Sequence, residues 1–181
     1  MRKALVVLLA GLFCVALNAK DYVVETAHSS VDFKIKHLSV SNVKGNFGTF
    51  SGNLSVENGT LSALSGEVSV DSINTNSEGR DAHIKDSEYF NTAKYPKATL
   101  KLVKLQGENG LFDLTIKGIT KQVTLSVEVS GTSKNQRGKE VVGLSINGKI
   151  NRKDFDIAKS TPNAALGEEV ILSVEIEGIE K

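Results

Sequence analysis

Residues 123–129 read Val123-Thr124-Leu125-Ser126-Val127-Glu128-Val129, with an apolar side chain at every second position. Successive side chains of a β-strand point to opposite faces of a sheet, so this period of two predicts a strand with one buried face. It is the cleanest such run in the chain. The weaker runs on either side of it are interpreted by the same rule.

Seven other stretches show the same alternation, at residues 31–36, 50–57, 64–71, 99–105, 112–117, 142–150 and 170–176. Turn signals separate several of them, and the strongest is Asn58-Gly59, a pair typical of tight hairpins. Within residues 99–105 the apolar side chains change parity between Leu102 and Val103, which predicts a bulge or burial on both faces. The chain is therefore predicted to contain eight β-strands.

Eight strands joined mostly by short loops are typical of a closed up-and-down barrel or of a sandwich. Two observations favour the barrel. Eight is the number of strands at which an interior is either just filled or holds one small ligand. The predicted inward positions carry mostly Val, Leu and Gly, so the protein's own side chains need not fill the interior. We therefore predict an all-β, eight-stranded antiparallel, lipocalin-like barrel.

The alternation stops at residues 80–96, which read RDAHIKDSEYFNTAKYP. Ser77 precedes this segment and is a residue type that caps helices, so a short helix is predicted here. In such a helix His83 and Ser87 are four residues apart and share one face. Pro96 then returns the backbone to an extended conformation. The segment is either a lid at the mouth of the barrel or a surface crossover that holds His83 by chance.

Residues 1–19 have the pattern of a secretory signal peptide, with a basic start, an apolar run from Ala4 to Leu17 and a small residue, Ala19. The run is too short to span a bilayer. We expect cleavage near Ala19, which leaves a single domain, residues 20–181, in the periplasm. Cys14 is the one cysteine and is removed with the peptide, so the mature chain has no disulfide, thiolate metal site or cysteine nucleophile.

Charge composition argues against polyanionic partners. The chain has 22 basic and 21 acidic side chains, and loss of Arg2 and Lys3 leaves a net charge near −1. It contains no run of basic residues. Because nucleic acids and anionic membrane surfaces attract clustered positive charge, both are poor candidates as partners on this pattern.

Six sequence motifs, taken together and in this order, are distinctive of one protein family. They lie at residues 28–37 (HSSVDFKIKH), 43–52 (VKGNFGTFSG), 72–96, 114–121 (LTIKGITK), 152–157 (RKDFDI) and 167–170 (GEEV). The third contains Arg-Asp-x-His, then a serine, an aromatic pair and Tyr-Pro. In this order the set resembles the YceI-like family of exported, lipocalin-like bacterial proteins that bind polyisoprenoids and related lipids. The resemblance covers nearly the whole chain after residue 20.

The resemblance implies a barrel whose lumen takes a long apolar chain and whose mouth is closed by the helical insertion. The ligand classes it implies are a polyisoprenoid, an isoprenoid quinone or a fatty-acid-like lipid, held for transport, storage or sensing without any cofactor. Homodimers are common in the family. Matching positions give lumen or rim aromatics at Phe33, Phe47, Phe50, Phe90 and Phe155, and a polar group at Arg80, Asp81, His83 and Ser87. His37 and Ile116 fall on the apolar parity of their strands and complete the predicted ligand-binding set.

A lumen of this kind supplies enough binding energy without an ionic contact. A ten-residue strand of about 33 Å, tilted by about 40°, gives a barrel roughly 25 Å tall, which matches an extended chain of about twenty carbons. Burial of twenty methylenes contributes roughly 16 kcal/mol, against an immobilisation cost of about 4 to 15 kcal/mol. The polar group near the insertion is therefore expected to select a head group.

Two alternatives to a binding protein remain. An enzyme would need a metal or acid–base site built from residues such as His28, His37, His83 and their neighbouring aspartates. No two of these histidines have ligand spacing on one element, and no activated serine motif or phosphate-binding glycine loop occurs, so we predict neither catalysis nor a bound metal. The second alternative is a structural barrel whose core is fully packed, which has the same strand pattern.

Overall fold

The computed structural model of the protein describes residues 19–181, so the predicted signal peptide and Cys14 lie outside the described residues apart from Ala19. The strands are β1 (Lys20–His37), β2 (Ser41–Phe47), β3 (Phe50–Glu57), β4 (Thr60–Ser69), β5 (Ile73–Asn74), β6 (Lys97–Gln106), β7 (Asn109–Ile116), β8 (Ile119–Lys134), β9 (Glu140–Asn151) and β10 (Leu166–Glu180). The helices are α1 (Glu78–Ile84) and two 3-10 turns, η1 (Val70–Ser72) and η2 (Arg152–Phe155).

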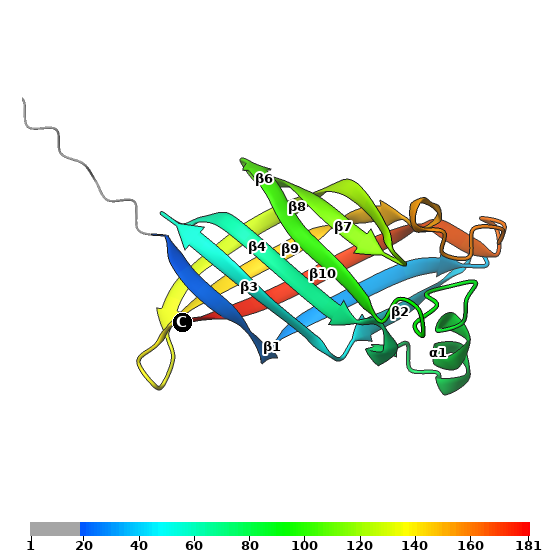
Figure 1. Cartoon of the computed structure of the whole chain (residues 1–181), viewed down its shortest axis with the longest axis horizontal. Coiled ribbons are helices and arrows are strands. Elements are labelled where there is room, and N and C mark those ends of the chain that lie inside the picture. The colour runs from blue at the N-terminus through cyan, green and yellow to red at the C-terminus, as the bar shows by residue number, and fades with distance from the viewer. Residues whose placement is uncertain (1–18) are drawn as a thin grey trace, which may run out of the picture.

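The strands form one closed antiparallel barrel (Figure 1). Each long strand pairs with the next along the wall, and β10 pairs back with β1 through partners such as Val31 and Val174. The successive strands β2 and β3 share one position in the wall, because the C-terminal half of β1 pairs with β2 and its first residues pair with β3. The wall therefore has eight strand positions. The predicted barrel is confirmed, and the closure excludes the sandwich.

Local irregularities explain where strand prediction was incomplete. Strand β1 begins at Lys20, well before the predicted start at residue 31. Its first part was not predicted because the register against β10 shifts between Glu25 and Ser30, which interrupts the alternation of apolar and polar residues. Strand β2 was not predicted, since its central inward position is Gly45. The bulge predicted within residues 99–105 is confirmed by a register shift between Leu102 and Lys104.

The interior of the barrel is packed at one end. A cluster of buried side chains fills the part of the barrel near the start of β1, with Tyr22, Leu54, Phe112, Val142 and Leu144 almost completely removed from solvent. Close packing of this kind is the main stabilising feature of a β-barrel of ordinary size. We call this region the packed end.

The opposite end of the barrel carries the helical insertion. A second, smaller cluster there includes Val70, Ile150, Phe155 and Ile157. In Figure 1, α1, the turn between β1 and β2 and the loop before β10 gather at this end, away from the C terminus. We call it the mouth. Within residues 19–181, none of the helices has the length and apolar character needed to cross a bilayer.

Candidate functional site

A cavity of about 470 Å³ lies in the barrel toward the mouth. Its wall consists mostly of apolar side chains at inward positions of β1, β2, β4, β6, β7 and β10, including Val31, Ile35, Val68, Leu114 and Leu172. A volume of this size is typical of a site for a small ligand. The alternation that predicts the strands therefore also produces the lining of the cavity.

Three of the predicted aromatics form a continuous edge of this cavity. The ring centroids of Phe33 and Phe47 are 5.7 Å apart, and those of Phe47 and Phe90 are 6.3 Å apart in an edge-to-face arrangement. Gly45 makes this possible, because a Cβ atom there would lie 2.5 Å from the ring of Phe33, its partner across the strands. Phe90 comes from the insertion, so the aromatic edge connects the barrel wall to the lid.

Glycine also leaves room in the adjoining part of the wall, formed by β3 and β4. Gly52 of β3 and Gly66 of β4 are direct partners across the two strands, and both line the cavity. Only the Ser51 backbone oxygen, at 3.6 Å, lies within 4 Å of a Cβ built on Gly66, so a side chain at this position has room. A Cβ at Gly52 would instead lie 3.0 Å from the Val24 side chain, so Gly66 is the glycine that leaves room in the cavity.

The insertion is held to the barrel through Thr75, a buried residue just before α1. Arg80 donates from Nε to the Thr75 hydroxyl and from Nη2 to the Thr75 carbonyl, each at 2.7 Å. Asp81 accepts from the Thr75 hydroxyl at 2.6 Å and from its backbone N–H at 2.9 Å. Ser77 occupies the N-cap position as predicted, but its side chain makes no cap hydrogen bond. Arg80 and Asp81 thus brace the lid, and Arg80 also lines the cavity.

His83 lines the mouth of the cavity, whereas Ser87 does not. Helix α1 ends at Ile84, so the predicted shared helical face of His83 and Ser87 does not form, and Ser87 lies exposed in the following turn. The ring of His83 instead packs edge-on against Tyr89, with centroids 4.9 Å apart. Its Nδ1 atom is 3.7 Å from a carboxylate oxygen of Asp86.

Arg152 is a further lining residue, and it was absent from the predicted site. Its side chain is 1% exposed, and its guanidinium donates to the backbone carbonyls of Ile157, Ala158, Thr161, Leu166 and Gly167. Burial lowers the pKa of this guanidinium, with a smaller opposing effect from Tyr89 and Glu168. Arg152 therefore fixes the loop before β10 over the mouth. The signal in the sequence is its parity, which it shares with the inward residues of β9.

Most of the predicted ligand-binding residues line one cavity, namely Phe33, His37, Phe47, Phe50, Arg80, His83, Phe90 and Ile116. Two predicted positions do not, and the prediction is corrected for both. Ser87 is displaced because the helix ends early. Phe155 lies in the 3-10 turn η2 and is buried in the second core cluster, and it does not line the cavity.

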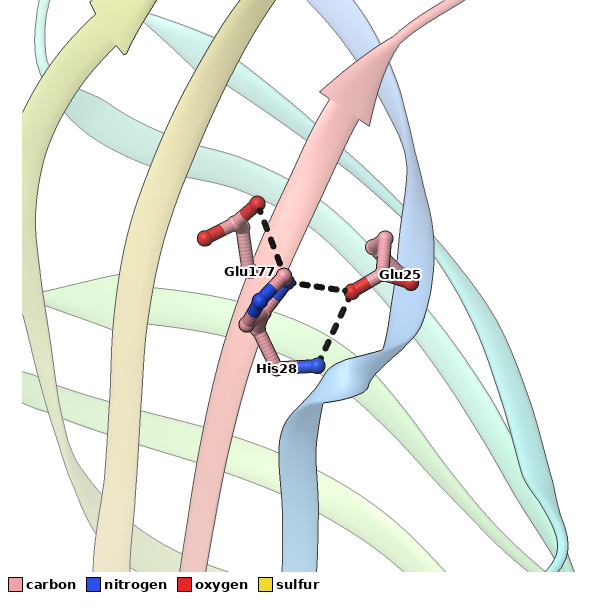
Figure 2. Close-up of side chains that lie close together, drawn as sticks. All are labelled: Glu25, His28 and Glu177. Carbon is pink, nitrogen blue, oxygen red and sulfur yellow. Dashed lines mark hydrogen bonds and ion pairs between the residues drawn. The ribbon is translucent and has the colours of Figure 1, made fainter. Parts of the chain in front are cut away.

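The histidines considered for an enzyme divide between two places. His37 and His83 line the cavity, while His28 lies on an irregular stretch of β1 beside Glu25 and Glu177 of β10 (Figure 2). The Nδ1 atom of His28 is 2.9 Å from Glu25 and 3.7 Å from Glu177. Glu25 also accepts backbone N–H groups of Ala27 and His28, and these contacts, led by that of Ala27, lower the pKa of its carboxyl. The group therefore holds the turn where the β1 register shifts.

Comparison with known proteins identifies a family that matches nearly all of the described chain. The family described as YceI-like domain matches residues 22–178. A UPF0312 protein of Staphylococcus aureus (strain N315) is 37% identical over 164 residues, which cover 87% of this chain and 96% of the relative.

Solved structures give the same picture. The crystal structure of the Campylobacter jejuni YCEI protein superposes with a TM-score of 0.73 at 37% identity, covering 82% of this chain and 91% of that one. A polyisoprenoid-binding domain from Saccharophagus degradans shares the fold, with a TM-score of 0.66 at 16% identity, and covers 88% of this chain and 98% of that one.

Proposed function

The chain belongs to the YceI-like family, and from this premise we propose that its barrel holds one long apolar chain, with a polar head group at the mouth. The observation that carries the proposal is the cavity of about 470 Å³, whose lining is mostly apolar and includes Arg80 and His83 of the lid. An apolar cavity of this size gains most from a ligand that excludes water from it. The proposed role is that of a binding protein, not a catalyst.

The volume of the cavity limits the length of the bound chain. At about 30 Å³ for each water-sized group, 470 Å³ holds about sixteen methylene-sized groups. This is shorter than the twenty carbons expected from the height of the barrel, because side chains fill the packed end. A longer polyisoprenoid would extend through the mouth or fold back on itself.

Burial of the chain accounts for most of the affinity. Sixteen methylenes contribute roughly 13 kcal/mol at about 0.8 kcal/mol each, and immobilisation costs about 4 to 15 kcal/mol. A hydrogen bond at the mouth adds about 1 to 3 kcal/mol. The apolar chain therefore determines whether a lipid binds, and the mouth residues determine which lipid binds best.

His83 is the proposed head-group contact. Arg80 already uses two donors on Thr75, so its main task is to hold the lid. The ring of His83 lies at the cavity edge and packs against Tyr89, and because Nδ1 lies beside Asp86, Nε2 is the nitrogen left to meet a hydroxyl or carbonyl. An isoprenoid alcohol, a quinone or a fatty acid satisfies this pattern. The fold shared with a domain described as polyisoprenoid-binding supports the choice of ligand class.

We further propose that the protein works in the periplasm, where residues 1–19 would direct it. Long apolar chains do not cross an aqueous compartment unaided, so a soluble carrier or store has a clear use there. The proposal of export rests on the sequence pattern alone.

Displacement of a fluorescent fatty probe by unlabelled lipids tests the binding function. In a series of fatty alcohols of increasing chain length, affinity is expected to rise by about fourfold per methylene, at 0.8 kcal/mol each, until roughly sixteen carbons. Beyond that length the gain should flatten, since added carbons lie outside the cavity. Absence of displacement at every chain length would leave the structural barrel as the better account.

A further inference from the structure

The turn between β1 and β2 exposes two large apolar side chains. Val40 is 82% exposed and Leu38 is 56% exposed. Among the large hydrophobic residues of the described chain, these two side chains are the most exposed. A single exposed apolar residue is ordinary, but two on one turn form a small apolar knob. We call residues 33–46, which include this turn, the mouth hairpin.

The exposure of the knob is built into the backbone. Leu38 and Ser39 both have positive φ, 49° and 59°, a conformation that costs energy for a residue with a side chain as large as leucine. The Leu38 N–H donates to the Ala165 carbonyl at 2.9 Å, and the Val40 N–H donates to the His37 carbonyl at 3.2 Å. The turn is therefore held against the loop before β10, with Val40 mostly exposed and Leu38 partly exposed.

Three lysines occupy the outward positions of the mouth hairpin. Phe33, Ile35 and Val43 line the cavity, while Lys34, Lys36 and Lys44 do not. Between Asp32 and Glu57 the chain has these three lysines and no acidic residue. Pairing of the strands therefore gathers positive charge that a linear search for basic runs misses.

Two of these lysines face each other directly. Lys34 and Lys44 are cross-strand partners, an arrangement of like charges that destabilises a sheet. Among the ion pairs within residues 19–181, none includes Lys34, Lys36 or Lys44. An external anionic surface would relieve this repulsion.

The knob is continuous with the cavity. Leu38 lines the cavity mouth together with His37, Leu166 and His83. A lipid that leaves through the mouth therefore passes the knob directly.

We propose that the mouth hairpin docks the protein on an anionic phospholipid bilayer, with Leu38 and Val40 inserted at the interface and the lysines on the phosphate groups. An apolar tip flanked by cationic side chains is the usual design of an interfacial anchor. Docking would place the mouth against the membrane, so a lipid moves between bilayer and barrel without crossing water. The transfer of lipid between bilayer and barrel rests on the proposed binding function, whereas docking on the membrane does not. The sequence predicted that anionic membranes are poor partners because it contains no linear run of basic residues. Lysines brought together by strand pairing do not form such a run.

Flotation with lipid vesicles tests the proposal. The protein is mixed with vesicles of phosphatidylcholine alone or of equal parts phosphatidylcholine and phosphatidylglycerol. Binding is expected with the anionic vesicles, and it should weaken as salt is raised. Val40→Asp should reduce binding by about tenfold or more, since a charge replaces an inserted side chain. Lys34→Gln combined with Lys44→Gln should reduce it by about fivefold per lysine.

Strand β6 provides matched controls away from the mouth hairpin. Val103 is exposed like Val40, and Lys101 and Lys104 are exposed lysines beside it; none of the three lines the cavity. Val103→Asp and the double change Lys101→Gln with Lys104→Gln should leave vesicle binding within about twofold of the unchanged protein. Equal losses for the two sets of variants, or equal binding to neutral vesicles, would overturn the proposal.

Two further readouts separate the possible failures. Size-exclusion chromatography reports whether a second copy of the protein covers the knob. If the protein forms a dimer that Val40→Asp dissociates, and it does not bind vesicles, the proposal is overturned. Mass spectrometry of extracted lipid reports cavity loading independently. A protein that floats through Val40 but never carries lipid supports docking and contradicts the binding function. A protein that carries lipid but does not bind anionic vesicles supports the binding function and contradicts docking.

Discussion

The packed end and the mouth of this barrel are made from the same strands but have opposite interiors. At the packed end, inward positions carry large side chains such as Phe112, which is 0% exposed, and Tyr22. Toward the mouth, Gly66 of β4 has no side chain at an inward position, and a cavity remains. The difference shows that alternation determines which face is inward, while residue size at each level determines whether the interior is filled. Stability is therefore concentrated at one end and binding at the other.

The largest expected effect compares one phenylalanine from each end. Phe112→Ala should lower the free energy of unfolding by about 3 to 5 kcal/mol, because it empties a fully packed site. Phe50→Ala should lower it by about 1 to 2 kcal/mol, since that side chain already borders open space. Chemical denaturation followed by circular dichroism measures both. Equal losses would mean that the two ends do not differ in packing.

Replacement of Arg152 is expected to damage the mouth specifically. Arg152→Met should cost about 2 to 4 kcal/mol, because it removes charged hydrogen bonds to five carbonyls of the loop before β10. Hydrogen exchange should show faster exchange in residues 157–167 than at the packed end. Lys153→Met is the matched control, and it should leave both readouts near those of the unchanged protein. Uniformly faster exchange over the whole barrel would contradict a local role.

Filling the cavity should weaken binding without harming the fold. Gly66→Leu places four carbons in the space beside β4, so a sixteen-carbon ligand should lose roughly 3 kcal/mol of affinity. A ligand of about eight carbons should be affected much less, since the remaining volume still holds it. Gly79→Leu, on the exposed face of α1, is the matched control. Unchanged affinity for the long ligand would show that it does not occupy this cavity.

Two residues of the lid should separate scaffolding from head-group selection. His83→Ala should weaken a fatty alcohol by about 1 to 3 kcal/mol and leave the matching hydrocarbon nearly unchanged. Arg80→Ala should weaken both ligands alike and lower the melting temperature, because Arg80 is bonded to Thr75. Titration of both variants with the two lipids measures this. A head-group effect confined to Arg80→Ala would reverse the two assignments.

The smallest expected effect is a pH dependence at the packed end. Hydrogen bonds from Lys20 at 2.7 Å and Tyr22 at 2.6 Å lower the pKa of Glu140 from its ordinary 4.5. A lowered folded-state pKa stabilises the protein above the ordinary pKa, and this contribution is lost as pH falls through the folded value. Glu140→Gln should therefore make the melting temperature less sensitive to pH between about 5 and 3. Glu108→Gln, in an exposed turn, is the control and should keep the original profile.

Local pattern explains why so much of the barrel was predictable. Alternation is a property of a single strand, so residues 123–129 and 142–150 identify β8 and β9 directly. The aromatic set Phe33, Phe47, Phe50 and Phe90 was predicted from matching motifs, and these residues do line one cavity. Strand β2 was missed because glycine at position 45 removes the apolar signal.

Other features depend on contacts between distant segments. Helix α1 ends at its C-cap residue, Lys85, and does not reach Ser87. The prediction that His83 and Ser87 share one helical face was therefore wrong. Phe155 was assigned to the lumen or rim because its position matches a family segment, but it lies in the 3-10 turn η2 and is buried in the second core cluster. Arg152 and the lysine pair Lys34 and Lys44 acquire their roles only when loops and strands are brought together. Sequence periodicity carries no information on such contacts.

The most direct test of the central claim is mass spectrometry of the purified protein under native conditions, followed by analysis of its organic extract. If the mouth end is a lipid site, the native mass should exceed that of the polypeptide by one ligand, and the extract should contain a long-chain lipid in equal molar amount. Gly66→Leu should reduce this occupancy, while Gly79→Leu should not. A native mass equal to that of the bare chain, with no lipid recovered after incubation with isoprenoid alcohols and fatty acids, would contradict the claim.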